Sequence, residues 1–588
     1  MAHRIRTGLS RRGSIGVAVV LALVLAAPSL MTGYQLDDWL HHLKLSGEAA
    51  VMGAETSSSA MFRLADGEPP HTRQLVESGF LPWWTLDTVR VSFWRPITVL
   101  THVLDHTLWP DSYFMMHLHS LVWFGAAVAL AGLMYRKLLA PAWAAGLAAL
   151  LFAIDDGHAM PAGWLASRTA TIALFWGLLA LWAHMRWREQ GRNEWLTLSV
   201  FSLVLSLLAK EEGVSTCAYL FAYAVFLDPG RLVSRALSLL PYAVTVLVWR
   251  LLYQGFGHGV AGSASCSDPV SSPAQFALHA LHRAPVLFLG QWALPPSDLH
   301  LALPGGGQWL LWAAGLLLLL VLAVVFVPMA RYDARIRFWA VGMGLSLLPA
   351  CAVLPSDRLL MWPGIGACGL LAQYLHARAE RREMWSRASA ARAIAPLLTF
   401  VLVTVHVVLA PLLLPMRMLA FATLGDIIEE SVVTAPLPDD AENKTVIFVN
   451  APNVYFTSYF PVIRQTLGLP VPGRIRTLSA NAPLPGPHDI ARVNEKTLRV
   501  TPRGGFSWYL VRDNVHPFAP GDTVDLGDIT VEITSVTRQG RPKEVEYRFD
   551  TSVDDPRYVW LVYKASQGQF APFLPPPLGQ VFTTDPYL

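Results

Sequence analysis

Long apolar segments without charged residues are the feature that most constrains the fold of this 588-residue chain. The first follows four arginines and extends from Gly13 to Leu36, which is enough for one membrane-spanning helix of about 20 residues. Further apolar runs follow, and each predicts another helix. They lie at 118–135, 138–154, 169–185, 195–209, 214–227, 236–253, 301–330, 338–356, 359–375 and 393–416.

The composition agrees with a membrane protein. Hydrophobic residues make up 53% of the chain and charged residues only 15%, whereas soluble domains contain about 25% charged residues. A formal net charge of +3 indicates no nucleic-acid partner. The four cysteines lack metal-ligand spacing, so we predict neither disulfides nor a zinc site. We expect a multi-pass protein surrounded by lipid bilayer.

Basic segments between the apolar runs predict the topology, because they stay on the cytoplasmic side. About 11 transmembrane helices result, with the N-terminus inside and the C-terminus outside, if residues 276–294 form an interfacial or re-entrant helix. The expected location is the cytoplasmic (inner) membrane. Beyond the N-terminal arginines, the basic segments lie at 136–137, 186–192, 231–235, 331–337 and 378–392.

The first apolar segment has a second interpretation. A signal peptide cleaved near Ala26 and Ala27 is the alternative to a permanent first span. Both interpretations place Asp37 and Asp38 outside the cytoplasm.

A large external loop is predicted at 34–116, within a transmembrane domain at 1–420. Its aromatic residues, among them Trp83, Trp84 and Trp94, are typical of helices that lie in the bilayer interface. The loop is therefore expected to have its own structure.

The composition changes after Pro415, and a β-rich extracytoplasmic domain is predicted at 421–588. Its strand-like runs lie at 445–449, 497–500, 523–533, 545–549 and 558–563. Its aromatic residues form either a carbohydrate platform or ordinary core. These are Tyr455, Phe456, Tyr459, Phe460, Trp508 and Tyr509.

The predicted topology brings polar residues from separate segments to the external side. Charges near a membrane are costly unless they are paired or functional, so a shared polar cavity is expected. Solvated loop acids, a charged turn, a snorkelling arginine and a simple ion pair are the plainer interpretations. The set is Asp37, Asp38, Arg95, His102, Asp105, His106, Asp155, Asp156, His158, Arg168, Lys210, Glu211, Glu212, Arg250, Asp357 and Arg358.

Several short motifs within residues 15–380 carry a family resemblance. They are Leu36-Asp37-Asp38-Trp39, Trp94-Arg95-Pro96-Ile97, His117 or His119, Gly163-Trp164-Leu165-Ala166-Ser167-Arg168, Leu207-Leu208-Ala209-Lys210-Glu211 and Ser356-Asp357-Arg358-Leu359-Leu360-Met361. Their order resembles the GT-C superfamily of polytopic membrane glycosyltransferases. The protein O-mannosyltransferases and the transmembrane O-mannosyltransferases with tetratricopeptide repeats are the most similar branch, although no such repeats follow here. Ala209 replaces the family's serine, and Asp357 replaces its glutamate.

The resemblance implies a helical GT-C-like fold and transfer of a sugar, with inversion, from a polyprenyl-phosphate-linked donor to a protein or glycan acceptor. A carboxylate is needed as base, and Asp38 is the first candidate, followed by Asp37. The lipid phosphate needs cations, for which Arg358 is preferred, followed by Lys210 and Arg250. No cofactor and no metal ligand is predicted, and a metal requirement stays open. Further binding candidates are Arg95, Arg168, Glu211 and His119.

Other functions fit the same pattern in part. A transporter or flippase for a lipid-linked glycan is one alternative, although transporters place charges near the bilayer midplane and often show related halves. A ligase for a whole lipid-linked glycan and a non-catalytic cell-envelope assembly protein are the others.

Overall fold

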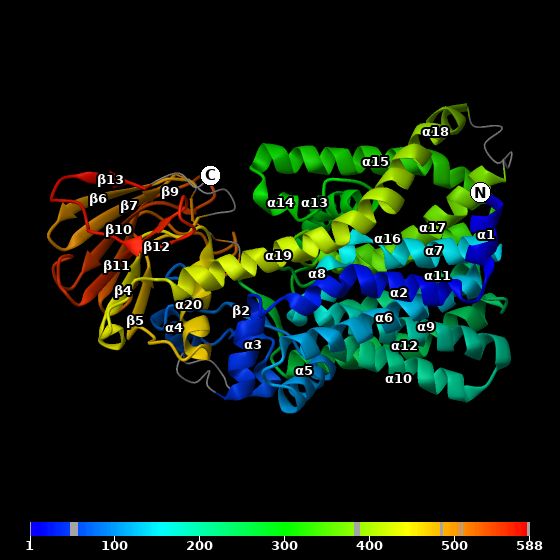
Figure 1. Cartoon of the computed structure of the whole chain (residues 1–588), viewed down its shortest axis with the longest axis horizontal. Coiled ribbons are helices and arrows are strands. Elements are labelled where there is room, and N and C mark those ends of the chain that lie inside the picture. Colours follow the sequence, from blue (N-terminus) through cyan, green and yellow to red (C-terminus); the bar gives the residue numbers. More distant parts are fainter. Residues whose placement is uncertain are drawn as a thin grey trace.

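The computed structural model describes residues 2–47, 57–380, 389–481, 486–503, 505–506, 508 and 510–584. Helices lie along the long axis of the molecule, and a strand-rich part occupies one end (Figure 1). Every apolar run predicted from the sequence contains a helix, which confirms the helical membrane part. The bundle contains α2 (Ser14–Ala26), α6 (Tyr113–Leu138), α7 (Ala142–Ala153), α8 (Ala159–Gly163), α9 (Arg168–Gln190), α10 (Asn193–Ala209), α11 (Thr216–Phe226), α12 (Leu232–Gly255), α13 (Pro273–Trp292), α14 (Leu299–Ala302), α15 (Gly305–Tyr332), α16 (Ala334–Ala350), α17 (Met361–Ala379), α18 (Ser389–Val403) and α19 (Ala410–Val433).

Among the described residues, six helical segments are long and apolar enough to cross a membrane. Their apolar side chains face outward to a large extent; only 11% of the most apolar stretch of α12 is buried. Exposed apolar surface of this extent requires lipid around it. The chain is a multi-pass membrane protein, and the total of eleven spans stays a prediction. The segments are Ser14–Met31, Tyr113–Leu138, Leu165–Gln190, Leu232–Gly255, Gly305–Tyr332 and Ala391–Val433.

Basic residues gather at the end of the bundle that lies away from the strand-rich part. The N-terminal helix α1 (Ala2–Ser10) brings Arg6 within 3.0 Å of Glu380, at the end of α17. Arg136, at the end of α6, donates a hydrogen bond to Ser14 at 3.1 Å. The predicted cytoplasmic segments therefore meet at one end, except for 381–388, which lies outside the described residues.

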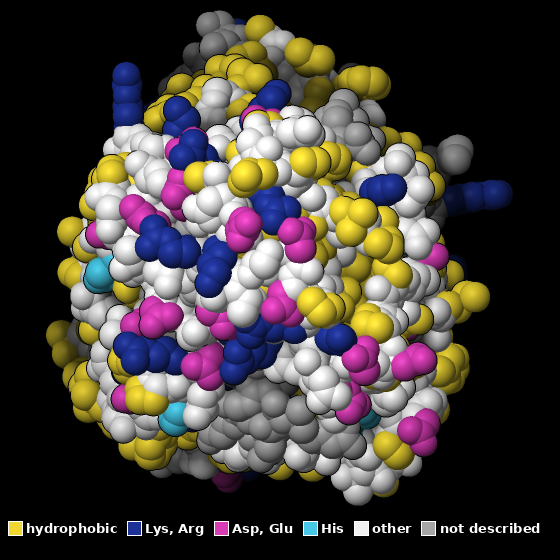
Figure 2. Space-filling view, turned by 90° about the vertical axis from the view of Figure 1, so that its left-hand side faces the viewer, with side chains coloured by type: hydrophobic (Ala, Val, Ile, Leu, Met, Phe, Trp, Pro, Cys, Tyr) yellow, Lys and Arg dark blue, Asp and Glu magenta, His cyan; other side chains and the backbone are white. Residues whose placement is uncertain are grey.

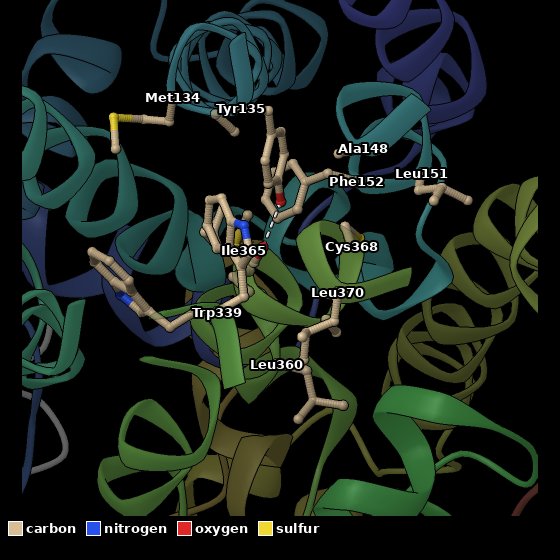
Figure 3. Close-up of a cluster of buried hydrophobic side chains, with 14 of the residues drawn as sticks. Met134, Tyr135, Ala148, Leu151, Phe152, Trp339, Leu360, Ile365, Cys368 and Leu370 are labelled. Atoms are coloured by element: carbon tan, nitrogen blue, oxygen red, sulfur yellow. Dashed lines mark hydrogen bonds between the residues drawn. The ribbon is translucent and has the colours of Figure 1, made fainter. Parts of the chain in front are cut away.

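The short helix α7 determines how deep in the bundle the polar residues that follow it lie. The 12 residues of α7 span about 18 Å, less than the hydrocarbon thickness of about 30 Å. Its neighbour α6 has 26 residues, so α7 ends inside the bundle, where the chain turns into the polar 3-10 segment Asp156–His158. Figure 3 shows the buried apolar side chains around α7, where Tyr135 of α6 donates a hydrogen bond to the carbonyl oxygen of Ile365 at 2.7 Å.

The segment predicted at 276–294 is helical as far as Trp292, where α13 ends. It runs beside α15, where Trp312 donates to the carbonyl oxygen of Leu281 at 3.0 Å and Gly315 leaves room for Pro285. The six segments given above do not include α13, so its predicted interfacial or re-entrant character stays a prediction.

The loop after α2, predicted to be external, packs partly against the C-terminal part of the chain. Trp83 and Trp84 are buried in one core with Val446 and Phe460. The prediction that these tryptophans lie in the bilayer interface is wrong, because a large aromatic side chain also suits a protein core. The loop contains α3 (Asp37–Ser46), α4 (Pro69–Glu77), α5 (Pro96–Leu108) and strands β1 (Arg63–Asp66) and β2 (Arg90–Ser92), which continue to β3 (Gly259–Ala261).

The C-terminal part contains an antiparallel sheet of order β13-β6-β7-β10-β9-β8 and a mixed sheet of order β12-β11-β4-β5. The predicted run 523–533 is two strands, because Gly527 adopts φ +84° and turns the chain between them. The strands are β4 (Thr445–Phe448), β5 (Arg474–Thr477), β6 (His488–Asn494), β7 (Thr497–Pro502), β8 (Thr523–Asp525), β9 (Ile529–Val536), β10 (Pro542–Phe549), β11 (Tyr558–Lys564), β12 (Gln569–Pro572) and β13 (Val581–Thr583).

Two helices lie where this part meets the rest of the molecule. The long helix α19 continues without interruption through the predicted domain boundary at 420 and 421, and α20 (Val454–Thr466) joins the parallel strands β4 and β5. A helical crossover between parallel strands is usual, but the sequence prediction did not include it. The face turned away from the bundle mixes acidic and basic side chains, as expected of a surface in water (Figure 2).

Candidate functional site

The acidic motif begins α3 in a strained turn. Leu36 has φ 46° and ψ −112°. Among the described residues, no other non-glycine residue has a positive φ. This conformation costs about 1–3 kcal/mol, and such strain concentrates at functional sites. The turn places Asp37 and Asp38 in the first turn of α3, where the helix amides favour negative charge.

Asp38 holds two backbone segments together. Its side chain is buried, Oδ1 accepts a hydrogen bond from the Ala166 amide at 2.7 Å, and Oδ2 accepts one from the Gln35 amide at 3.1 Å. Burial raises the pKa of Asp38 well above its ordinary value, although both amides oppose the shift. Both Asp38 oxygens thus already accept a backbone hydrogen bond, and which of the two acids acts as base stays a prediction.

Asp37 is the more accessible acid of the motif. Its side chain is partly exposed, and Oδ1 accepts a hydrogen bond from the hydroxyl of Tyr459 in α20. Within the described part of the chain, Oδ2 has no hydrogen-bond partner. One carboxylate oxygen is therefore held, and the other is available to take a proton.

Trp164 links the acidic motif to a cation. The indole Nε1 donates to the carbonyl oxygen of Gln35 at 3.0 Å, directly before the motif. The Arg358 guanidinium lies 5.6 Å from the centre of the Trp164 ring. Arg358 is partly exposed and, among the described residues, has no carboxylate partner. The cation preferred from the sequence thus shares one indole with the turn that bears the acids, and its hydrogen-bond donors are available.

Two more predicted cations lie near Arg358, and both are paired. Arg95 donates to Glu211 Oε2 from Nε at 3.0 Å and from Nη2 at 2.7 Å. Lys210 Nζ lies 2.6 Å from Glu212 Oε2. Burial lowers the pKa of Lys210, Glu212 opposes this shift, and Arg95 and Arg358 add to it. A phosphate approaching Arg358 would therefore meet three cations balanced by two glutamates.

The buried Arg168 and the partly exposed His119 belong to one network around Asp105. Arg168 Nη1 lies 2.5 Å from Asp105 Oδ2, and His119 Nδ1 lies 2.6 Å from Asp105 Oδ1. Arg168 also donates to Ser120 Oγ and to the carbonyl oxygen of Met116, both at 2.8 Å. The protein itself occupies these donors, and the binding role of both residues stays a prediction.

Replacing Asp105 with asparagine is expected to destabilise the protein by about 3–5 kcal/mol, because it leaves the buried Arg168 charge without its counterion. Thermal unfolding in detergent measures the effect. Asp111→Asn, at an exposed position nearby, is the control and should leave the Tm unchanged. Equal Tm values for the two variants would contradict the assignment.

Arg250 is also neutralised. Its Nη2 forms an ion pair with Asp268, and the guanidinium lies 5.7 Å from the Tyr253 ring. The pair joins the end of α12 to the segment before α13. Arg250 therefore ranks below Arg358 as a phosphate ligand.

Arg417 lies in a second cluster of charges, called the polar centre here, together with Asp156, Asp298 and Asp357; the sequence prediction missed it. Its Nη1 lies 2.7 Å from Asp156 and 2.7 Å from Asp357, and its Nη2 lies 2.8 Å from Asp298. The available signal was a single cation directly after the uncharged run 393–416, since an intramembrane charge needs a partner. Its three partners lie in three separate segments between helices, after α7, α13 and α16. The sequence alone does not show that these segments meet.

The cluster around Arg417 has an excess of carboxylates. Asp155 stands beside the three partners of Arg417 and accepts from Gln291 Nε2 at 3.3 Å. Burial raises the pKa of Asp357 to about 6; Arg417 opposes the shift and Asp298 adds to it. Burial and Asp155 raise the pKa of Asp156.

The shifted pKa of Asp357 predicts a pH effect on stability. Between about pH 4 and 6 the folded protein binds more protons at the Asp357 carboxyl than the unfolded chain does. The stability that this carboxyl contributes is therefore fully present below about pH 4 and is lost as the pH rises through about 6. Asp357→Asn is expected to flatten this part of the Tm profile by a few degrees. The exposed Asp439→Asn serves as control, and an unchanged profile in Asp357→Asn would contradict the prediction.

The hollow at the basic end of the bundle lies apart from these polar groups. Across the described ranges, no three His, Cys, Asp or Glu side chains are arranged to hold a metal ion. A hollow of about 660 Å³ lies at the basic end of the bundle, where Trp143, Asp333 and His376 line it. Because α7 separates that end from Asp155, this hollow does not belong to the polar centre.

Comparison with known proteins gives only distant structural likenesses. No family model and no curated protein matches the chain. The apo form of the Archaeoglobus fulgidus oligosaccharyltransferase has a TM-score of 0.40 at 14% identity, over 79% of this chain and 64% of the other. Its complex with an inhibitory peptide and a dolichol-phosphate scores 0.42 at 13% identity, over 77% and 63%.

A third likeness is to ArnT from Cupriavidus metallidurans bound to undecaprenyl phosphate, with a TM-score of 0.37 at 14% identity, over 79% of this chain and 90% of the other. Against the Archaeoglobus fulgidus oligosaccharyltransferase, by contrast, the chain covers 64% and 63% of the other protein, which is less than two thirds of its length. Scores below 0.5 decide neither its fold family nor its activity. The O-mannosyltransferase branch stays a prediction.

Proposed function

We propose that this protein is a GT-C type membrane glycosyltransferase, which moves a sugar from a polyprenyl-phosphate-linked donor to a protein or glycan acceptor on the extracytoplasmic side. One observation carries the proposal: Trp164 contacts both the turn that bears the acidic motif and Arg358. A base and a phosphate-binding cation are the two groups that such a transfer needs, and here one indole connects them.

The chemistry follows from these two groups. The acceptor hydroxyl attacks the anomeric carbon of the sugar while Asp37 takes the hydroxyl proton. The bond between the anomeric carbon and the phosphate oxygen breaks, and Arg358, supported by Lys210, stabilises the departing lipid phosphate. A single displacement of this kind inverts the anomeric carbon, with the base and the phosphate on opposite sides of the sugar.

The side of the reaction follows from the arrangement of charges. The basic connections lie at one end of the bundle, and the acidic motif and the C-terminal part lie at the other, which under the positive-inside rule supports a site on the extracytoplasmic side. Reporter fusions at Gly157, Arg188 and Gly540 test this topology. Arg188 is expected inside and the other two outside; an inward-facing Gly540 would overturn the arrangement.

The test of the activity uses the purified full chain in lipid nanodiscs. Sugars on undecaprenyl phosphate and on dolichol phosphate are offered with peptide and glycan acceptors. We expect release of polyprenyl phosphate together with a glycosylated acceptor. If no donor is consumed by folded protein, the proposed activity fails.

A transporter or flippase for lipid-linked glycans is the second candidate, favoured by the ion cluster around Arg417 inside the bundle. Reconstitution in vesicles with a labelled lipid-linked sugar separates the two candidates. Movement of intact lipid-linked sugar between leaflets, without release of polyprenyl phosphate, would favour transport.

A further inference from the structure

The C-terminal part of the chain reaches the acidic motif through one side chain. Tyr459, in α20, is 4% exposed and donates its hydroxyl hydrogen bond to Asp37 Oδ1, across 422 positions of sequence. The sequence left the role of this tyrosine open between a carbohydrate platform and core. The structure places its ring in the core and its hydroxyl on the carboxylate.

The position of the tyrosine is fixed from several sides. The ring of Phe80 meets it edge-on, with centroids 6.4 Å apart, and Tyr455 stacks one helical turn away at 6.2 Å. Arg464, later in α20, donates to the carbonyl oxygen of Val432 at the end of α19, at 3.1 Å. The hydroxyl is thus held by α20, by α19 and by the external loop together.

A tyrosine in this place suits a carboxylate that must accept a proton. Burial, followed by the charge of Asp37, raises the pKa of Tyr459 well above its ordinary value, so its hydroxyl remains a donor. A hydrogen bond to one carboxylate oxygen fixes the rotamer and leaves the other oxygen to the acceptor. Without this bond, the partly exposed Asp37 side chain would sample other rotamers.

We propose that Tyr459 is a positioning residue for Asp37, and that the C-terminal part of the chain thereby belongs to the catalytic unit. The inference rests on the proposed function, with Asp37 as the base. It explains how a domain that contributes no reacting group can still control the reaction.

Tyr459→Phe tests the inference, because it removes the hydroxyl and keeps the ring. In the sugar-transfer assay kcat is expected to fall about tenfold, the effect of one lost hydrogen bond, while the KM for the lipid donor stays within about twofold. The acidic limb of the kcat/KM profile should move to higher pH, since the charged carboxylate loses a donor.

Tyr547→Phe is the matched control. Tyr547 is also buried in the C-terminal part, and its hydroxyl donates to the carbonyl oxygen of Leu478, away from the acidic motif. Rates are taken per folded protein after size-exclusion chromatography. Loss of kcat in Tyr459→Phe but not in Tyr547→Phe supports the inference; equal rates and equal pH profiles in both overturn it.

A double variant separates this inference from the proposed function. If Tyr459 acts through Asp37, adding Tyr459→Phe to Asp37→Asn causes no further loss. A further tenfold loss overturns the positioning role. Full activity of Asp37→Asn alone would remove the proposed base itself, whereas an inactive Asp37→Asn beside a fully active Tyr459→Phe would refute only the inference drawn here.

Discussion

Asp37→Asn is expected to lower kcat by about 10²–10⁴-fold, the usual contribution of a general base, with little change in the KM for the donor. The amide keeps the shape of the side chain and can still accept the Tyr459 hydrogen bond, but it takes no proton from an acceptor hydroxyl. The variant should therefore fold, bind the lipid-linked donor and fail in transfer. Single-turnover assays of released polyprenyl phosphate measure the loss.

Asp38→Asn is the matched control one residue further along. An asparagine presents an NH₂ group towards one of the two backbone amides that Asp38 now bonds, at Ala166 and Gln35, so the main expected loss is in folded yield and Tm. If folded Asp38→Asn is inactive while Asp37→Asn is fully active, Asp38 is the base, as the sequence predicts.

Arg358→Ala is expected to lower kcat/KM for the lipid-linked donor by about 10²–10³-fold, as for other groups that stabilise charge developing in a transition state. Arg358 suits a phosphate because it is partly exposed, its guanidinium lies over the Trp164 ring, and no carboxylate among the described residues pairs with it. Arg358→Lys should recover part of the activity, since lysine restores the charge but not the two-pronged geometry. Initial rates over a range of donor concentrations measure both variants.

Arg250→Ala is the control for loss of positive charge. Arg250 already forms an ion pair with Asp268, so its removal should change the rate much less than removal of Arg358. Equal losses in the two variants would mean that net charge, rather than the position of Arg358, supports donor binding.

The parts of the fold that follow from local pattern were predictable. Uncharged runs identify the helices of the bundle, and alternating runs between glycines and prolines identify β4, β7, β10 and β11. Features that depend on distant partners were not predictable. Trp83 and Trp84 suit an interface and a core equally well by composition, and only the packing against the C-terminal sheets places them in a core.

The candidate site shows the same division. The sequence identifies Asp37, Asp38 and Arg358 as charges that need an explanation near a membrane. It does not show which charges already have partners, because an ion pair depends on atoms brought together from separate segments. Arg168 is neutralised by Asp105, 63 positions away, and Arg417 by Asp156, 261 positions away.

The sequence by itself determined that the chain is a helical membrane protein with a strand-rich C-terminal part, and that acids follow its first apolar segment. Hydrophobicity and period are local properties, so the sequence carries them directly. Only the tertiary structure decided which acid is accessible. The two neighbouring aspartates have the same intrinsic chemistry, and they differ because backbone amides of Gln35 and Ala166 occupy Asp38 while one hydroxyl from α20 holds Asp37 and leaves an oxygen free.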